Sequence, residues 1–224
     1  MFPSRIASVL GKGTLPNAYS LSFEGTDDYV NLGASSDFDL TNNWTISCWA
    51  KNDNATTRDG GREMLFGKYE GGSNGRCYRL YFLADTVYYA AGYNSGASVV
   101  EIVSPSITIN NWNHIAVTFA TGVMTMYVNG SSVVSTDNSG TLTATFAKNS
   151  VPLEIGQYDG GYGNFEGLID EVSVWDAVLD ADAVAAIYNS GTLIALDADS
   201  GNYDNSANLQ GWWRMGDGDT FPTI

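Results

Sequence analysis

The chain is poor in several residue types that would point to particular functions. It contains one histidine and two cysteines in 224 residues, so it offers neither a cysteine–histidine metal site nor a disulfide framework. Lysine and arginine together number 10 against 25 acidic residues, which leaves a formal net charge of -15. A surface this acidic repels phosphate backbones, and we therefore expect no nucleic-acid partner.

Long apolar runs are absent as well. A membrane-spanning helix needs roughly 18 to 20 consecutive apolar residues, and no such run occurs in the sequence. The opening residues MFPSRIASVLGKG also lack the apolar core of a secretory signal peptide. We expect a protein that does not enter membranes and is made in a cytosol, where it stays or from which lysis releases it.

The chain does contain a hydrophobic fraction of 44%, enough for a sizeable core. Short alternating segments recur between turns of glycine, asparagine and aspartate, which is the pattern of antiparallel strands. The segment NWTISCWAKN alternates most clearly, and Asn129-Gly130 predicts a two-residue hairpin turn with two positive φ angles. The predicted strands cover residues 19–25, 28–33, 43–52, 63–70, 77–84, 86–94, 98–104, 111–122, 124–135, 152–158, 168–176 and 209–216.

One helix is predicted near the C-terminus, at residues 179–191. Asp180 or Asp182 suits its N-cap, and Asn189-Ser190-Gly191 ends it after an apolar stripe. Many short strands and one helix predict an all-β sandwich or barrel, because a parallel α/β fold would need crossover helices.

The domain organisation follows from where regular patterns begin and end. Residues 1–17 are predicted to form an N-terminal arm, since Gly11, Gly13 and Pro16 interrupt any regular element. Residues 18–218 then form one domain, and residues 219–224 form a C-terminal tail.

Several segments together resemble a known superfamily. They occur in the order found in laminin-G-like and pentraxin-like jelly rolls, and they read SFEGTDDYVNLG, WTISCWAK, NNWNHIAVTFATGVMTMYVNG, LEIGQ and GLIDEVSVWDAVLDADAVAAIYNSG. Over residues 18–218 the chain therefore resembles the concanavalin A-like lectin/glucanase superfamily. The resemblance implies an all-β, two-sheet antiparallel jelly-roll β-sandwich with one short helix near the C-terminus, and rim loops that bind ligand or calcium.

The resemblance also bears on the branch of the superfamily. Secreted pentraxins pair a cysteine at the position of Cys48 with one in the W-x-H-I strand, where this chain has Ala116. We therefore expect Cys48 and Cys77 to be free thiols, and the bacterial or phage branch to be the nearer one. The closing WWRMGDGD and the N-terminal arm resemble jelly-roll proteins of marine phage virions.

Two places suit calcium, which takes oxygen ligands from carboxylates, amides and carbonyls. A glycine-rich loop at residues 156–166 resembles the pentraxin calcium loop. This resemblance implies Gln157, Asp159 and Glu166 as ligands, together with the carbonyl of Tyr158. This loop is one residue shorter than in the family, and a glutamate that the family uses is missing. The alternative is a solvated acidic loop.

The second place is Asp170 in the segment LIDEV. The resemblance implies that Asp170 holds a structural calcium together with Glu24, Gly25 and Asp27 of the FEGTDD turn. The alternative is that Asp170 accepts backbone hydrogen bonds and organises a turn.

Ligand binding is expected at aromatic residues rather than at a catalytic set. Tyr93, Tyr158 and Tyr162 lie in loops or at strand ends, where tyrosines stack on sugar rings or enter protein interfaces. Trp44, Trp49, Trp112 and Trp175 fall in or beside strand patterns, and most of them are assigned to the core. The E-x-D-x-x-E strand of the superfamily's glucanases is absent, and His114 is interpreted as a strand residue.

These features predict a non-enzymatic binding or structural module. The first hypothesis is a decoration or adhesin protein on a phage-like virion surface, oligomeric or bound to other protein subunits of an assembly. The alternative is a calcium-dependent lectin domain that binds a surface glycan and acts outside the cell after release. A degenerate glycosidase is a distant third.

Overall fold

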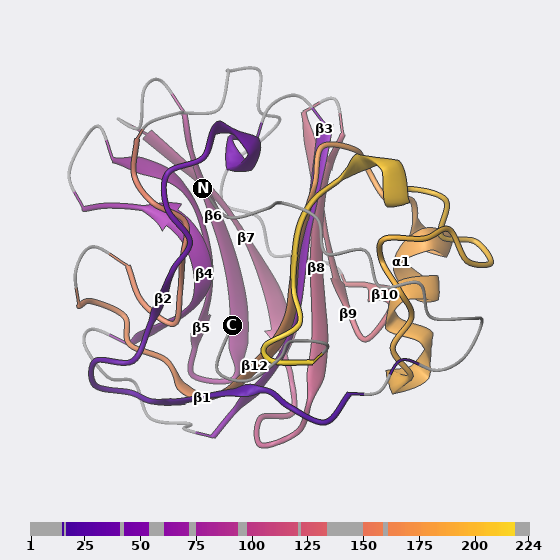
Figure 1. Ribbon diagram of the computed structural model, residues 1–224. Coiled ribbons are helices and arrows are strands. Elements are labelled where there is room, and N and C mark those ends of the chain that lie inside the picture. Colours follow the sequence, from indigo (N-terminus) through magenta and orange to yellow (C-terminus); the bar gives the residue numbers. More distant parts are fainter. Residues whose placement is uncertain are drawn as a thin grey trace.

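The computed structural model describes residues 15, 17–40, 43–53, 61–71, 75–93, 98–120, 122–133, 150–158 and 161–217. Within these residues two antiparallel sheets pack face to face, and the helix α1 (Ala181–Tyr188) lies on the outside of one of them (Figure 1). This arrangement confirms the predicted all-β sandwich. The predicted arm, apart from Leu15 and Asn17, and the predicted tail lie outside the described residues.

Both sheets combine pairs of strands that are consecutive in the sequence with pairs that lie far apart in it. The seven-stranded sheet has the order β1-β12-β3-β8-β9-β10, with β13 also paired to β12. Its strands are β1 (Leu21–Glu24), β3 (Asn43–Asn52), β8 (Asn113–Ala120), β9 (Val123–Val128), β10 (Ser131–Ser132), β12 (Glu166–Trp175) and β13 (Leu209–Trp213). The six-stranded sheet has the order β2-β11-β4-β5-β6-β7, from β2 (Val30–Asn31), β4 (Arg62–Tyr69), β5 (Arg76–Leu83), β6 (Thr86–Tyr93), β7 (Ser98–Ser106) and β11 (Glu154–Ile155).

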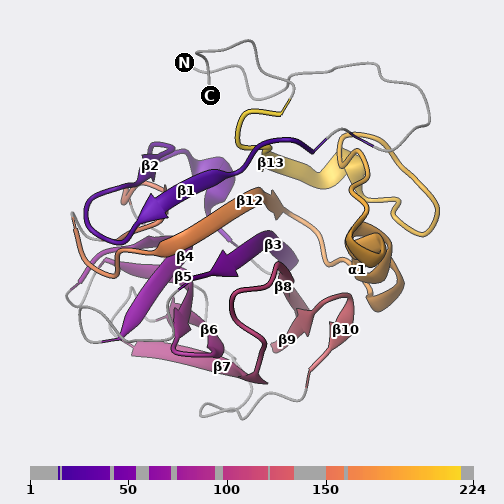
Figure 2. The ribbon, with the colours of Figure 1, turned by 90° about the horizontal axis from the view of Figure 1, so that it is seen from below.

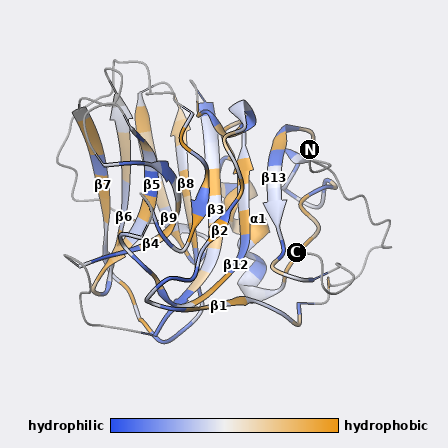
Figure 3. Ribbon diagram, turned by 60° about the vertical axis from the view of Figure 1, so that its left-hand side comes forward, coloured by the Kyte–Doolittle hydropathy of each residue, from blue (hydrophilic) through white to orange (hydrophobic). Residues whose placement is uncertain are grey.

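The main core fills the space between the sheets. Successive side chains of a strand point to opposite faces, so Trp44, Ile46 and Cys48 of β3 enter this core while Ser47 and Trp49 face the other way. Figure 3 shows the resulting alternation of apolar and polar positions along the strands. Cys48 and Cys77 are both buried free thiols, as predicted.

The outer face of the seven-stranded sheet is covered by α1 and the chain that follows it. The Asp180 carboxylate caps the helix by accepting a hydrogen bond of 2.8 Å from the Ala183 N–H. The buried residues of α1 pack with Trp175 and Tyr203 in a second core cluster. Seen from below, the seven-stranded sheet is thus the middle of three layers (Figure 2). No helix in the described part is long and apolar enough to cross a membrane.

Strand β12 changes its outer partner half-way along. Its first half pairs with β1, from Glu24 opposite Glu166 to Leu21 opposite Ile169, and its second half pairs with β13. Between the two halves the register with β3 shifts, and Glu171 takes a positive φ of 52°. This irregularity places Asp170 and Glu171 at the junction of β1 and β13.

Two local predictions are confirmed at single-residue level. Asn129 and Gly130 join β9 to β10 with φ angles of 51° and 76°. The predicted strand at residues 43–52 has the same bounds as β3.

Candidate functional site

An acidic turn follows β1. In the described part of the chain, only Glu24, Asp27 and Asp28 form a group of three ligating side chains whose oxygen atoms lie within 4.8 Å of one another. Asp28 accepts a hydrogen bond of 2.9 Å from the Glu24 N–H, which closes the turn. The side chain of Asn164 donates to the carbonyl of Thr26, so the glycine-rich loop lies against this turn.

The predicted calcium ligands are partly brought together here. Glu166 stands opposite Glu24 across the strand pair, and the amide oxygen of Asn164 is buried without a hydrogen-bond partner. Oxygen atoms of these kinds match the preference of calcium, so the turn fits such an ion. Gln157 is buried in the same loop, and Asp159 lies outside the described residues.

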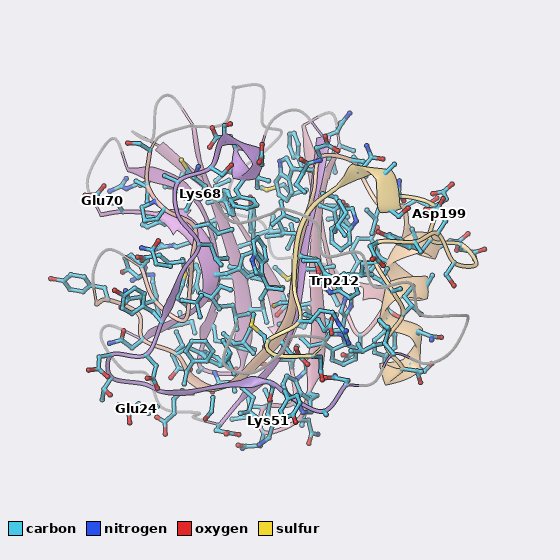
Figure 4. All side chains as sticks on the ribbon, in the orientation of Figure 1. Glu24, Lys51, Lys68, Glu70, Asp199 and Trp212 are labelled. Atoms are coloured by element: carbon cyan, nitrogen blue, oxygen red, sulfur yellow. The ribbon has the colours of Figure 1, made fainter. Side chains whose placement is uncertain are left out.

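The predicted grouping of Asp170 with Asp27 does not form. Glu166 is the residue of β12 that faces the acidic turn, and Asp170 lies four residues further along. At about 3.3 Å per residue this separation is about 13 Å. Figure 4 shows Glu24 at the lower edge of the molecule, well away from Trp212, whose indole donates to the Glu171 carboxylate.

Asp170 instead belongs to a buried acidic group at the β1–β13 junction. Its carboxylate accepts 2.8 Å from the Glu171 N–H, and the side chain is 2% exposed. Burial, and next the charge of Glu171, raise the pKa of Asp170 to about 7, although hydrogen bonds from the Glu171 backbone and the Asn17 side chain act in the opposite direction. Asp170 thus accepts a backbone hydrogen bond, as the alternative predicted, at a register shift within β12 and not in a turn.

The neighbouring acids are engaged by other groups. Burial raises the pKa of Glu171 to about 7, although Trp212 and Arg214 donate to its carboxylate. The carboxylate of Asp217 accepts the N–H of Ala18 at 3.0 Å and so ties the start of the domain to its end.

Beside Asp170 lies a hollow with a volume of about 330 Å³. Trp112 on its wall is 38% exposed, and the rings of Trp49 and Tyr188 stack with centroids 5.7 Å apart. The lining therefore combines aromatic faces with a carboxylate and amides; its residues are Asn17, Trp49, Trp112, Asn129, Asp170, Tyr188, Gly191 and Leu193.

The aromatic wall rests on His114 of β8. The imidazole centroid lies 5.3 Å from that of Trp49 and 6.0 Å from that of Tyr188, and its Nε2 lies 2.9 Å from the Ser47 hydroxyl. Burial lowers the pKa of His114 to about 3, so the ring is neutral at pH 7. Ser47 and His114 are buried and are not among the residues that line the hollow.

Two of the four tryptophans in or beside strand patterns lie outside the core. Trp44 and Trp175 are fully buried, as expected, but Trp49 and Trp112 line the hollow. For Trp49 the alternation of the strand could have shown this. Trp49 lies an odd number of residues from Trp44 and from Cys48, so its side chain points to the opposite face of β3. Trp112 falls within the strand predicted at residues 111–122, but the observed β8 begins only at Asn113, so Trp112 precedes it.

The predicted ligand-binding tyrosines lie at the other sheet. Tyr158 and Tyr162 exchange backbone hydrogen bonds of 2.9 and 3.0 Å, and Tyr158 packs beside Tyr69 over the outer face of the six-stranded sheet. Tyr93 belongs to β6, and its side chain lies outside the described part. The structure therefore separates Tyr158 and Tyr162 from the hollow.

Comparisons with known proteins agree with the fold. The family model described as the concanavalin A-like lectin/glucanases superfamily matches residues 24–185. No curated protein matches the chain. The CBM40 of the Ruminococcus gnavus IT-sialidase, bound to α2,3 sialyllactose, is 16% identical with a TM-score of 0.59, over 79% of this chain and 100% of its own.

Two further solved structures are similar. Domain 4 of AbnA, a GH43 extracellular arabinanase from Geobacillus stearothermophilus in complex with arabinotriose, is 18% identical with a TM-score of 0.54, over 75% of this chain and 76% of its own. The ligand binding domain of botulinum neurotoxin serotype D, in complex with N-acetylneuraminic acid, is 14% identical with a TM-score of 0.60, over 79% of this chain and 43% of its own. The chain thus spans less than half of that toxin structure, and identities this low show a shared fold alone.

Proposed function

The chain belongs to the family described as the concanavalin A-like lectin/glucanases superfamily, and we propose that it is a non-catalytic carbohydrate-binding domain. The observation that carries this proposal is the aromatic hollow beside Asp170. The proposal is supported by similar folds solved with sialyllactose, arabinotriose and N-acetylneuraminic acid. The virion-surface role, with other protein subunits as partners, gains no support from these comparisons and stays a prediction.

The lining of the hollow has the chemistry that sugars require. The exposed ring of Trp112 offers an aromatic face for the apolar side of a sugar ring. Asp170 and Asn129 provide polar atoms for hydroxyl groups at the edge of that ring. A volume of about 330 Å³ is at the small end of the range for small-molecule sites, roughly 300 to 1,000 Å³. It suits the end of a glycan chain better than a long internal stretch.

The same lining argues against hydrolysis. Glycosidases place two carboxyl groups on opposite sides of the scissile bond. Among the described residues that line the hollow, Asp170 is the single carboxylate, whereas Glu171 is held by Trp212 and Arg214. The hollow is therefore better suited to holding a sugar than to cleaving one.

Calcium is part of this proposal as a structural ion at the acidic turn. Glu24, Asp27 and Asp28 would hold it, and its charge would relieve the repulsion among the three carboxylates. The turn lies against the glycine-rich loop through Asn164, so such an ion would fix this rim of the sandwich.

Glycan-array screening followed by isothermal titration calorimetry with the best ligand tests the proposal. We expect Trp112→Ala to weaken binding at least about tenfold, because aromatic anchors commonly contribute more than 1 kcal/mol to an interface. Tyr29→Ala is the matched control, since Tyr29 is 50% exposed and does not line the hollow. Equal losses in the two variants, or no effect of Trp112→Ala, would place the ligand elsewhere. Absence of any glycan ligand would refute the proposed function.

A further inference from the structure

The outer face of the six-stranded sheet holds a buried arginine among tyrosine rings. Arg79 of β5 is 8% exposed, and its Cζ lies 4.1 Å from the ring centroid of Tyr69, 4.7 Å from that of Tyr81 and 5.6 Å from that of Tyr158. Cation–π contacts of this kind require the guanidinium to lie close to the aromatic faces. The position of the cation is therefore set by three rings from three separate segments of the chain.

Arg79 has no anionic partner among the residues that the structure describes. Its Nε is buried without a hydrogen bond, and the ion pairs of the described part involve other residues. The carboxylate of Glu101 on the same face accepts the hydroxyl of Tyr81. A buried charge without a counter-charge is costly, and aromatic faces offset only part of that cost. The site thus presents a fixed cation for which the described residues show no ion pair, beside one carboxylate, Glu101, that Tyr81 binds.

The rim of this site suits a sugar ring. Tyr162 is 59% exposed, and its ring centroid lies 6.3 Å from that of the half-buried Tyr158. The exposed Arg62 adds a second cation, with its Cζ 5.8 Å from the Tyr81 ring centroid. Tyrosine faces pack on the apolar side of sugar rings, and a guanidinium pairs through two parallel hydrogen bonds with a carboxylate or sulfate group.

We propose that this face is a second binding site, in which Arg79 receives the carboxylate or sulfate group of an acidic saccharide and Tyr158 and Tyr162 pack against its ring. The site is separate from the hollow, because the two lie on the outer faces of opposite sheets. It does not depend on the proposed role of the hollow. The net charge of -15 repels densely charged polyanions, which favours a ligand with few charges.

The test compares an acidic saccharide with its uncharged ester and with a sulfated saccharide. Trigalacturonate, its full methyl ester and a sulfated chondroitin disaccharide are titrated by ligand-observed NMR into the full chain with chelator present, so that calcium bridges are excluded. We expect trigalacturonate or the sulfated disaccharide to bind, the uncharged ester to bind at least about tenfold more weakly, and Arg79→Met to lose the preference for charge. Arg79→Lys keeps the positive charge but loses the planar guanidinium with its paired N–H donors. Its preference for the charged ligand over the ester should therefore lie between those of the unmodified chain and Arg79→Met.

Two controls locate the site and guard against misfolding. Arg76→Met on the same strand and Trp112→Ala in the hollow should leave binding of the acidic sugar unchanged. Because the ester comparison uses the unmodified chain, it remains decisive if Arg79→Met does not fold. The proposal is overturned if neither acidic sugar binds, if the ester binds as well as the acid, or if Arg79→Met retains the preference. Tighter binding of a tri-aspartate peptide than of either sugar would overturn the saccharide assignment.

Discussion

Replacing Asp170 with asparagine should change how stability depends on pH. Burial raises the pKa of Asp170 from its ordinary value of 3.8 to about 7. Between these values the folded chain holds a proton that the unfolded chain releases, so the free energy of unfolding falls as pH rises through this window. Each pKa unit corresponds to about 1.4 kcal/mol, and the gap therefore corresponds to about 4 kcal/mol at most. Small local rearrangements would reduce this figure to roughly 2–4 kcal/mol.

Asparagine has no proton to release and keeps an oxygen for the Glu171 N–H. The stability of Asp170→Asn relative to the unmodified chain should therefore rise by about 2–4 kcal/mol between pH 4 and pH 8. The measurement is urea unfolding at several pH values with chelator present, and Asp204→Asn at an exposed acid is the control. A difference between Asp170→Asn and the unmodified chain that stays constant from pH 4 to pH 8 would refute the reasoning.

Two further predictions concern the acidic turn and the helix. Calcium at a hundredfold excess over its Kd should raise the free energy of unfolding by about 2.7 kcal/mol. Asp27→Asn should remove most of this stabilisation, whereas Asp170→Asn should retain it. If thermal melting shows the reverse pattern for the two variants, the ion binds at Asp170 instead. Asp180→Ala should cost about 1 kcal/mol in urea unfolding, because it removes the hydrogen bond to the Ala183 N–H. Asp182→Asn is its control, and equal effects of the two changes would mean that the cap contributes nothing.

The fold was largely predictable because its signals are local. Alternation along residues 43–52 identifies β3, and the Asn129-Gly130 pair identifies a hairpin by the φ angles it tolerates. Asp180 before an apolar stripe identifies the start of α1. Each of these patterns depends on backbone geometry over a few residues, so it can be read without knowing the rest of the molecule.

The binding surfaces were not predictable in this way. The hollow joins Trp49, Trp112 and Tyr188 from three distant segments, and Arg79 meets tyrosines from β4, β5 and the loop after β11. The resemblance implied that Asp170 lies beside the FEGTDD turn, but the register of β12 with β1 leaves it about 13 Å further along the strand. Burial of Asp170 beside Glu171 then changed its proton affinity. Contacts between distant segments and the loss of water around a charge arise only from long-range packing, and no local pattern in the chain encodes them.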